Sequence, residues 1–231
     1  MSRPEANVTR SRRLWLPEME GVMARWYDRQ RGTAANISAY QKQASQLTAG
    51  LKPGATVLEV APGPGYLAIE IARLGNLRVT GLDISHTMVE LASGHARQAG
   101  VTVDFRHGDV VAMPFGPESF DLIVCQAAFK NFRQPVAALD EMYRVLQGGG
   151  TAVIQDLRRD TSGAEIDDEV RRQALSGLSA VITRQILRGL RRRALSSAEF
   201  ERVVAASLFR NGAMRFDGIG LELRLQKPVA A

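Results

Sequence analysis

The sequence has little of several residue types and patterns that mark particular classes of protein. It contains a single cysteine, Cys125, so no internal disulfide can form and a reducing compartment is expected. The three histidines (His86, His95 and His107) lack the spacing of metal ligands, so we expect no metal site. No apolar run reaches the ~20 residues of a membrane span, and the N-terminus lacks the apolar stretch of a secretory signal. We therefore expect a cytoplasmic protein with no membrane span.

Negative charge is in deficit: positively charged residues outnumber acidic ones, and most of them are arginine. The net charge is +6, concentrated in residues 1–13 and between Arg184 and Arg193. We expect residues 1–13 to form a flexible basic arm and the second run to be a solvated helix face. Contact with an RNA backbone is the alternative for the second run. Because that run contains no aromatic side chain to stack on bases, nucleic acid is not the expected partner.

Residues 14–231 are expected to form a single domain whose first part is a helical lid. Residues 14–50 predict two lid helices, the first with an apolar stripe made of Trp15, Met19, Val22, Met23 and Trp26. Residues 51–157 then alternate short apolar strands with helices, as in a cofactor-binding core. The expected strands span 55–60, 77–82, 101–106, 120–125 and 151–156, and the expected helices span 65–74, 86–99 and 133–147. Glycines 148–150 are expected to end the last of these helices.

The pattern changes after residue 157. Residues 158–195 predict a helical lid insertion with an apolar side made of Ile166, Val170, Ala174, Leu178, Val181 and Ile182. Ser196 and Glu199 form a capping-box pattern for a closing helix that reaches about Arg210. Strands at 213–217 and 219–227 are too close together for a crossover, so they must pair antiparallel. The sequence thus predicts a doubly wound α/β fold with a mixed sheet and ligands at the carboxyl ends of its strands.

A glycine-rich turn between the first strand and the first core helix is the main functional signal. Gly63 and Gly65 satisfy a dinucleotide fingerprint, and Asp83 follows at the distance of a ribose-binding acid. A pyrophosphate, however, needs backbone N–H donors at this turn, and Pro62 and Pro64 remove two of them. A cofactor without phosphate fits better, and S-adenosylmethionine is such a cofactor.

Acidic residues close three successive expected strands. Glu59 is placed to receive an ammonium group, Asp83 to accept two ribose hydroxyls, and Asp109 to accept an adenine amino group. The alternatives are that Glu59 caps a helix, that Asp83 caps the 86–99 helix, and that Asp109 only forms a turn. The further expected cofactor contacts are Ala61, Gly63, Gly65, Ile84, Met88, Gly108, Val110 and Gln126.

With these residues the chain resembles class I S-adenosylmethionine-dependent methyltransferases over about residues 50–157. The segments that carry the resemblance are 57–65, 81–88, 108–110, 113–115, 119–124 and 142–150. The resemblance implies a Rossmann-like seven-stranded sheet whose last strand is antiparallel. One position departs from the family, since Ala61 replaces the usual first glycine, which is tolerable if its φ is negative. Residues 129–132 are similar to a segment of quinone-ring C-methyltransferases.

Methyl transfer from a sulfonium requires alignment and exclusion of water more than a dedicated nucleophile, although a general base helps with phenols and enols. The candidate catalytic residues are Asp156, Lys130 and Tyr27. Asp156 could instead pair with Arg158 or Arg159, Lys130 could be exposed, and Tyr27 could pack in the core or close over the amino-acid end of the cofactor.

The expected acceptor is a small molecule such as a phenol, a quinol or a related natural product. No Pro-Pro-Tyr segment follows the fourth strand, which argues against enzymes that methylate amino groups of DNA bases or glutamine. The alternatives are an RNA methyltransferase, a dinucleotide-dependent oxidoreductase, and a cofactor-binding protein without catalysis. A homodimer is left open.

Overall fold

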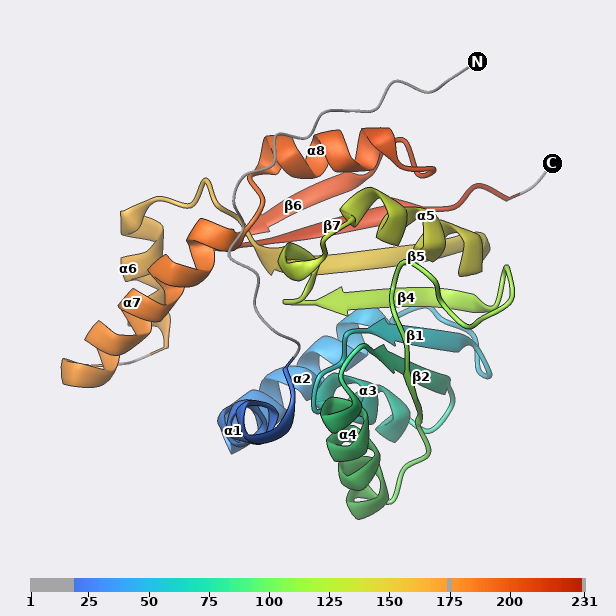
Figure 1. Cartoon of the computed structure of the whole chain (residues 1–231), viewed down its shortest axis with the longest axis horizontal. Helices are drawn as coiled ribbons and strands as arrows, with labels where there is room; N and C mark the ends of the chain where they lie inside the picture. The colour runs from blue at the N-terminus through green and yellow to red at the C-terminus, as the bar shows by residue number, and fades with distance from the viewer. Residues whose placement is uncertain (1–18, 174–175, 230–231) are drawn as a thin grey trace.

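A single mixed β-sheet forms the centre of the computed structural model, which describes residues 19–173 and 176–229 (Figure 1). Its strands are β1 (Thr56–Val60), β2 (Arg78–Asp83), β3 (Asp104–His107), β4 (Phe120–Gln126), β5 (Leu146–Leu157), β6 (Ala213–Asp217) and β7 (Gly220–Gln226). They lie in the order β3-β2-β1-β4-β5-β7-β6. The strands β1 to β5 pair in parallel, whereas β7 is antiparallel to both β5 and β6. The predicted mixed sheet with an antiparallel closing pair is confirmed.

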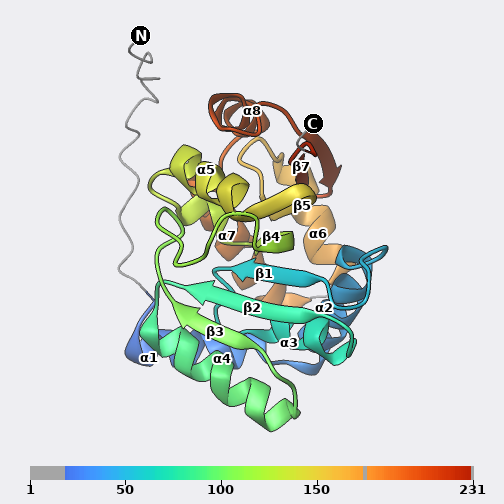
Figure 2. The same ribbon diagram turned by 90° about the vertical axis from the view of Figure 1, so that its right-hand side faces the viewer.

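Helices cover both sides of this sheet. They are α1 (Gly21–Arg31), α2 (Ala34–Leu47), α3 (Tyr66–Arg73), α4 (His86–Ala99), α5 (Pro135–Val145), α6 (Gly163–Arg172), α7 (Gly177–Arg193) and α8 (Ser197–Ala206), with a 3-10 turn, η1, at Phe129–Asn131. Figure 2 shows α5 and α8 on one side of the sheet and α2 and α3 on the other. Each side has its own apolar core, one around Phe129 and Phe200 and the other around Leu67 and Ile71. None of the described helices is both long and apolar enough to cross a bilayer.

The three glycines at 148–150 lie in a strand, so the prediction that they end a helix is wrong. Helix α5 already ends at Val145, whose carbonyl accepts the amide N–H of Ser119 at 2.7 Å. The N–H of Gly149 donates to the carbonyl of Lys227 at 2.8 Å, which extends the pairing of β5 beyond β7. A partner 78 positions later in the sequence therefore decides the conformation of this segment.

The third strand begins later than its composition predicts. It spans residues 104–107 instead of 101–106, because the N–H of Val101 still bonds the carbonyl of Ala96 in the last turn of α4. By contrast, the capping box at Ser196 is confirmed, since its hydroxyl accepts the N–H of Glu199 and the Glu199 carboxylate accepts the N–H of Ser196. The helix that it starts ends at Ala206, before the expected Arg210.

Part of the apolar face predicted for each of the segments 14–50 and 158–195 is exposed to solvent. In α1 only Ala24 is buried, while Val22, Met23 and Trp26 are exposed, and Trp15 lies outside the described residues. The insertion after β5 forms two helices. Ile166 and Val170 of α6 are buried, but Leu178, Val181 and Ile182 of α7 are exposed, and Ala174 lies outside the described residues. A 3.6-residue period identifies an apolar face but does not say which way it turns.

Candidate functional site

The parallel strands β1, β2 and β4 end at one edge of the sheet, and this edge carries the candidate site. The register pairs Glu59 of β1 with Gly81 of β2 and Val124 of β4, so Glu59, Asp83 and Gln126 all lie at the carboxyl ends of neighbouring strands. Asp109 follows the end of β3, the next strand outward. The structure thus brings together the side chains that the sequence assigned to one ligand.

Glu59 is a buried acid with an unused hydrogen-bonding atom. Its side chain is 3% exposed, and its Oε2 has no hydrogen-bond partner among the described residues. Burial raises the pKa of Glu59 to about 8, the negative charge of Asp83 adds to this, and the Ala68 N–H and Arg31 oppose it. The helix-cap alternative holds in part: the N-cap residue of α3 is Gly65, but the Glu59 carboxylate accepts the N–H of Ala68 in the first turn of this helix. An unsatisfied buried acid at the end of β1 is suited to a cationic donor on a ligand.

Asp83 connects the glycine-rich turn to the start of α4. Its two carboxylate oxygens accept the N–H of Gly63 at 2.9 Å and the N–H of Ser85 at 2.9 Å. Burial is the main cause that raises the pKa of Asp83 above its ordinary value. The N-cap of α4 is Ser85, whose Oγ accepts the N–H of Met88 at 3.0 Å, so the cap alternative for Asp83 is wrong. Each oxygen keeps a further lone pair for a ligand hydroxyl.

The backbone of the turn is left-handed at three positions. Ala61, Gly63 and Gly65 have φ of 55°, 55° and 80°. The condition for an unstrained Ala61, a negative φ, is therefore not met, and this alanine carries a strain of ~1 kcal/mol. A Cβ on Gly63 would approach only Cε1 of Tyr27, at 3.8 Å, whereas a Cβ on Gly65 would lie 2.6 Å from the ring of Phe105. Space for a ligand is therefore kept at Gly63, while Gly65 permits close packing.

The residues expected around the adenine differ in how exposed they are. Asp109 is exposed and its Oδ1 accepts the N–H of Val111 at 3.1 Å, so the turn interpretation describes it. Met88 is only 3% exposed and belongs to the protein interior, whereas Ile84 is 42% exposed at this end of the site. Gly108 allows close packing, since a Cβ there would lie 2.8 Å from Leu82. Val110 is half-buried against the larger core.

The start of α1 is fastened to the start of α4. The Glu20 carboxylate accepts the N–H groups of His86 at 2.8 Å and Thr87 at 3.1 Å, and the Ser85 hydroxyl donates to the carbonyl of Met19 at 2.7 Å. The hydrogen bonds from Thr87 and His86 contribute to lowering the pKa of Glu20. These contacts hold α1 across the edge of the sheet beside Asp83, and the sequence alone did not identify Glu20.

Tyr27 and Arg31 of α1 face the glycine-rich turn. The guanidinium carbon of Arg31 lies 5.9 Å from the centre of the Tyr27 ring and 5.4 Å from that of Tyr40. Arg31 is also close enough to Glu59 to lower its pKa. A cation therefore lies within electrostatic reach of the buried acid. Arg31 belongs to no recognisable sequence pattern, so only the fold reveals it.

A chain of amide side chains fixes Gln126 at the end of β4. Its Nε2 donates to Oε1 of Gln43 on α2 at 2.7 Å, and Gln43 donates in turn to Gln155 on β5. Gln155 donates to the carboxylate of Glu222 on β7 at 2.7 Å. Four residues from four elements are linked in this way. Gln43 could not be found from the sequence, because α2 carries no motif.

Asp156 and Lys130, both predicted to be catalytic, form a buried ion pair. Asp156 Oδ1 accepts from Lys130 Nζ at 3.0 Å and from the N–H of Leu157 at 2.8 Å, and Oδ2 accepts from the N–H of Lys130 at 2.9 Å. Lys130 is 7% exposed, so the alternative that it is exposed is wrong. Pairing of Asp156 with arginine is also wrong, since Arg158 pairs with Asp160 and Glu165, and Arg159 pairs with Glu199.

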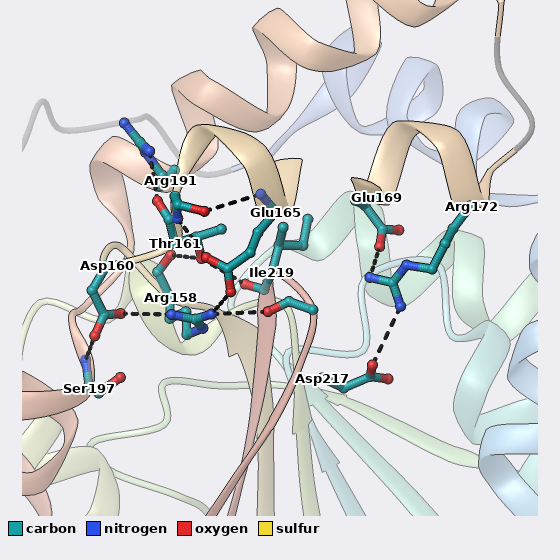
Figure 3. Close-up of polar contacts among 12 residues, drawn as sticks. Arg158, Asp160, Thr161, Glu165, Glu169, Arg172, Arg191, Ser197, Asp217 and Ile219 are labelled. Atoms are coloured by element: carbon teal, nitrogen blue, oxygen red, sulfur yellow. Dashed lines mark hydrogen bonds and ion pairs between the residues drawn. The ribbon is translucent and has the colours of Figure 1, made fainter. Parts of the chain in front are cut away.

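The insertion α6–α7 is attached to the turn between β6 and β7 (Figure 3). The guanidinium of Arg158 pairs with Glu165 at the start of α6 and donates to the carbonyl of Gly218 at 3.2 Å. Farther along α6, Arg172 lies 3.4 Å from the carboxylate of Asp217. These contacts fix α6 at the same edge of the sheet as the ends of β4 and β5. Within residues 19–173 and 176–229, no three His, Cys, Asp or Glu side chains gather to hold a metal ion.

Comparisons with known proteins agree with this geometry. Residues 58–154 match the family model described as a methyltransferase domain. A demethylmenaquinone methyltransferase of Deinococcus radiodurans is 35% identical over 108 residues, which are 46% of this chain and 45% of the relative. A ubiquinone/menaquinone biosynthesis C-methyltransferase of Bdellovibrio bacteriovorus is 37% identical over 106 residues, again 46% and 45% of the two chains. The matches therefore span about half the length of these relatives.

Solved structures show the same fold. A candidate S-adenosyl-L-methionine-dependent methyltransferase of Methanococcus maripaludis superposes with a TM-score of 0.73 at 20% identity and covers 94% of this chain and 97% of its own. A SAM-dependent methyltransferase of Aquifex aeolicus superposes with a TM-score of 0.66 at 17% identity and covers 87% and 96%. These likenesses extend over the lid elements as well as the core.

The buried proton on Glu59 makes stability depend on pH. The folded pKa of Glu59 is raised to about 8 from 4.5, so its contribution to folding is fully present below pH 4.5 and is lost as pH rises through 8. We expect the free energy of unfolding of the ligand-free protein to fall between these values, and we expect Glu59→Gln to flatten that fall. Urea unfolding of both proteins across this range measures it. Parallel slopes in the two proteins would contradict the assignment.

The geometry and the family match agree. The sheet is parallel with an antiparallel closing strand, β1 and β2 each carry a buried acid at the carboxyl end, and a strained turn lies between these acids. Residues 58–154 thus match the methyltransferase domain family, and the chain has the fold of class I S-adenosylmethionine-dependent methyltransferases.

Proposed function

We propose that the chain transfers the methyl group of S-adenosylmethionine to a small hydroxylated aromatic acceptor, of the phenol or quinol type. The observation that carries this proposal is the unused Oε2 of buried Glu59 beside the open space at Gly63. Support for the acceptor class comes from the relatives, which are named for methylation of quinones. Because they are matched over only about half their length, the acceptor stays a proposal.

The residues of the site fit the parts of this cofactor. Glu59 would hold the ammonium group through its unused Oε2, and Arg31, which lies close enough to Glu59 to lower its pKa, would hold the carboxylate. Asp83 would accept the ribose hydroxyls with its remaining lone pairs. Ile84 and Asp109 would lie against the adenine. No phosphate-binding row of N–H groups is needed, which agrees with Pro62 and Pro64 in the turn.

The bound cofactor supplies an electrophilic methyl group on a sulfonium. The chain itself contributes orientation and exclusion of water, which can supply most of the acceleration of an in-line displacement. Tyr27, which faces Gly63, covers the amino-acid end of the cofactor. Gln126, held by Gln43, fixes a polar side chain at the end of β4 where the acceptor and the cofactor meet.

Asp156 and Lys130 position the acceptor side of the site. The Asp156 carboxylate accepts hydrogen bonds from Lys130 and Leu157. The Lys130 Nζ also donates a hydrogen bond to the carbonyl of Ala127. Ala127 follows β4 with a strained φ of 56°. The ion pair therefore holds the strained segment after β4 in place. Phe129 and Ala128 pack in the larger apolar core and so anchor this segment.

Asp83→Ala tests the cofactor site. We expect the dissociation constant of S-adenosylhomocysteine to rise at least about tenfold, because two ribose hydroxyls and the N–H of Gly63 lose their acceptor. Isothermal titration calorimetry measures this. The matched control is Asp104→Ala, which removes a half-exposed carboxylate that pairs with Arg106 and should leave the affinity unchanged. Equal affinities for wild type and Asp83→Ala would refute the ribose assignment.

The acceptor class is tested by turnover of methyl-labelled cofactor. The panel contains phenols, quinols, primary amines and a single-stranded RNA, with NAD binding measured alongside. We expect label on hydroxylated aromatics only, and no NAD binding. Label on RNA or on amines but on no aromatic would contradict the proposed acceptor. Cofactor binding without turnover on any member would support a binding protein instead.

A further inference from the structure

Helix α7 exposes a row of aliphatic side chains to solvent. Leu178, Val181, Ile182 and Ile186 are 75%, 50%, 50% and 53% exposed, and no described residue of this helix is buried. Positions three and four apart lie on one face of a helix, so these four side chains form one apolar surface. An apolar face of this kind normally turns toward the protein, and here it does not.

Arginine continues the same outer side toward the end of the helix. Arg188 and Arg192 are exposed, whereas Arg184 pairs with Asp167 of α6 and Arg191 donates to the carbonyl of Thr161. The inward arginines attach α7 to the protein, and the outward ones lie two and six residues beyond Ile186. A helix with aliphatic and cationic side chains together on its free side is typical of binding at the surface of a bilayer.

A second segment repeats this pattern at the same end of the molecule. Figure 1 shows α1 and α7 at the end toward which β4 and β5 point. On α1, Val22, Met23 and Trp26 are 82%, 57% and 54% exposed. Tryptophan is favoured where apolar and polar surroundings meet. Two segments more than 150 residues apart in the sequence thus expose apolar side chains near the mouth of the site.

We propose that α7 docks the protein on an anionic phospholipid surface, with its aliphatic side chains in the outer layer of the bilayer and its outward arginines against the lipid phosphates. The net charge of +6 favours such a surface. RNA fits less well, because four exposed aliphatic side chains gain nothing from a phosphodiester backbone and α7 contains no aromatic residue. A second copy fits less well, because it would bring two arginine-rich helices together. This docking does not depend on the acceptor.

Co-sedimentation of the full chain with vesicles tests the proposal. One vesicle is phosphatidylcholine alone, and the other also contains phosphatidylglycerol. We expect binding to the anionic vesicles only, and the double variant Ile182→Glu/Ile186→Glu should reduce the bound fraction at least about tenfold. The matched control is Leu74→Glu/Leu208→Glu, which places the same charges at two exposed leucines away from α7 and should bind like wild type.

Circular dichroism establishes that each variant is folded. Arg188→Gln/Arg192→Gln serves as a second, milder variant and should weaken binding to anionic vesicles without changing the apolar face. Failure of the wild type to bind anionic vesicles would overturn the proposal, as would equal losses in the α7 and control variants. The proposal would also be overturned if the α7 variants lost binding to a single-stranded RNA, or lost dimer formation, but kept vesicle binding. RNA or a second copy would then be the partner of α7.

Discussion

The buried carboxyl of Glu59 is the constraint around which the candidate site is organised. It lies at the end of the central strand pair, has an oxygen with no partner among the described residues, and has a pKa raised to about 8. Leaving such an atom unsatisfied costs free energy in the ligand-free protein. A ligand that brings an ammonium group offsets this cost, so the buried carboxyl favours a cationic ligand. Asp83 and Arg31 both lie close enough to Glu59 to shift its pKa, and Asp83 also bonds the turn at Gly63.

Two residues with strained backbone conformations lie at the same edge of the sheet as Glu59. Ala61 after β1 and Ala127 after β4 both have positive φ, and β1 and β4 are neighbours in the sheet. A residue without glycine's freedom stays in this region only when its surroundings hold it there. The N–H of Ala61 bonds the carbonyl of Leu82 at 2.8 Å, and that of Ala127 bonds the carbonyl of Gln155 at 2.7 Å. Both reversals of the chain are thus fixed by hydrogen bonds to a neighbouring strand.

The core could be predicted from the sequence because its signals are local. Acids that close successive parallel strands must meet at one edge, so Glu59 and Asp83 were found before the structure. The glycines at 148–150 were misjudged because glycine can end a helix or continue a strand, and pairing with residues after β7 decides which. The orientation of the helices α1 and α7 needed the structure for a different reason. Periodicity finds an apolar face on α1 and α7, but only packing shows that the face is free. Arg31, Glu20 and Gln43 act through tertiary contacts that no short pattern encodes.

Proton release on cofactor binding tests the role of Glu59 most directly. Calorimetric titration with S-adenosylhomocysteine near neutral pH, in two buffers of different ionisation enthalpy, counts the protons. Because the pKa of Glu59 is about 8 in the free protein, binding of an ammonium group must ionise it. The wild type should release about one proton per site and Glu59→Gln none. Binding by the wild type without proton release would contradict this account of the site.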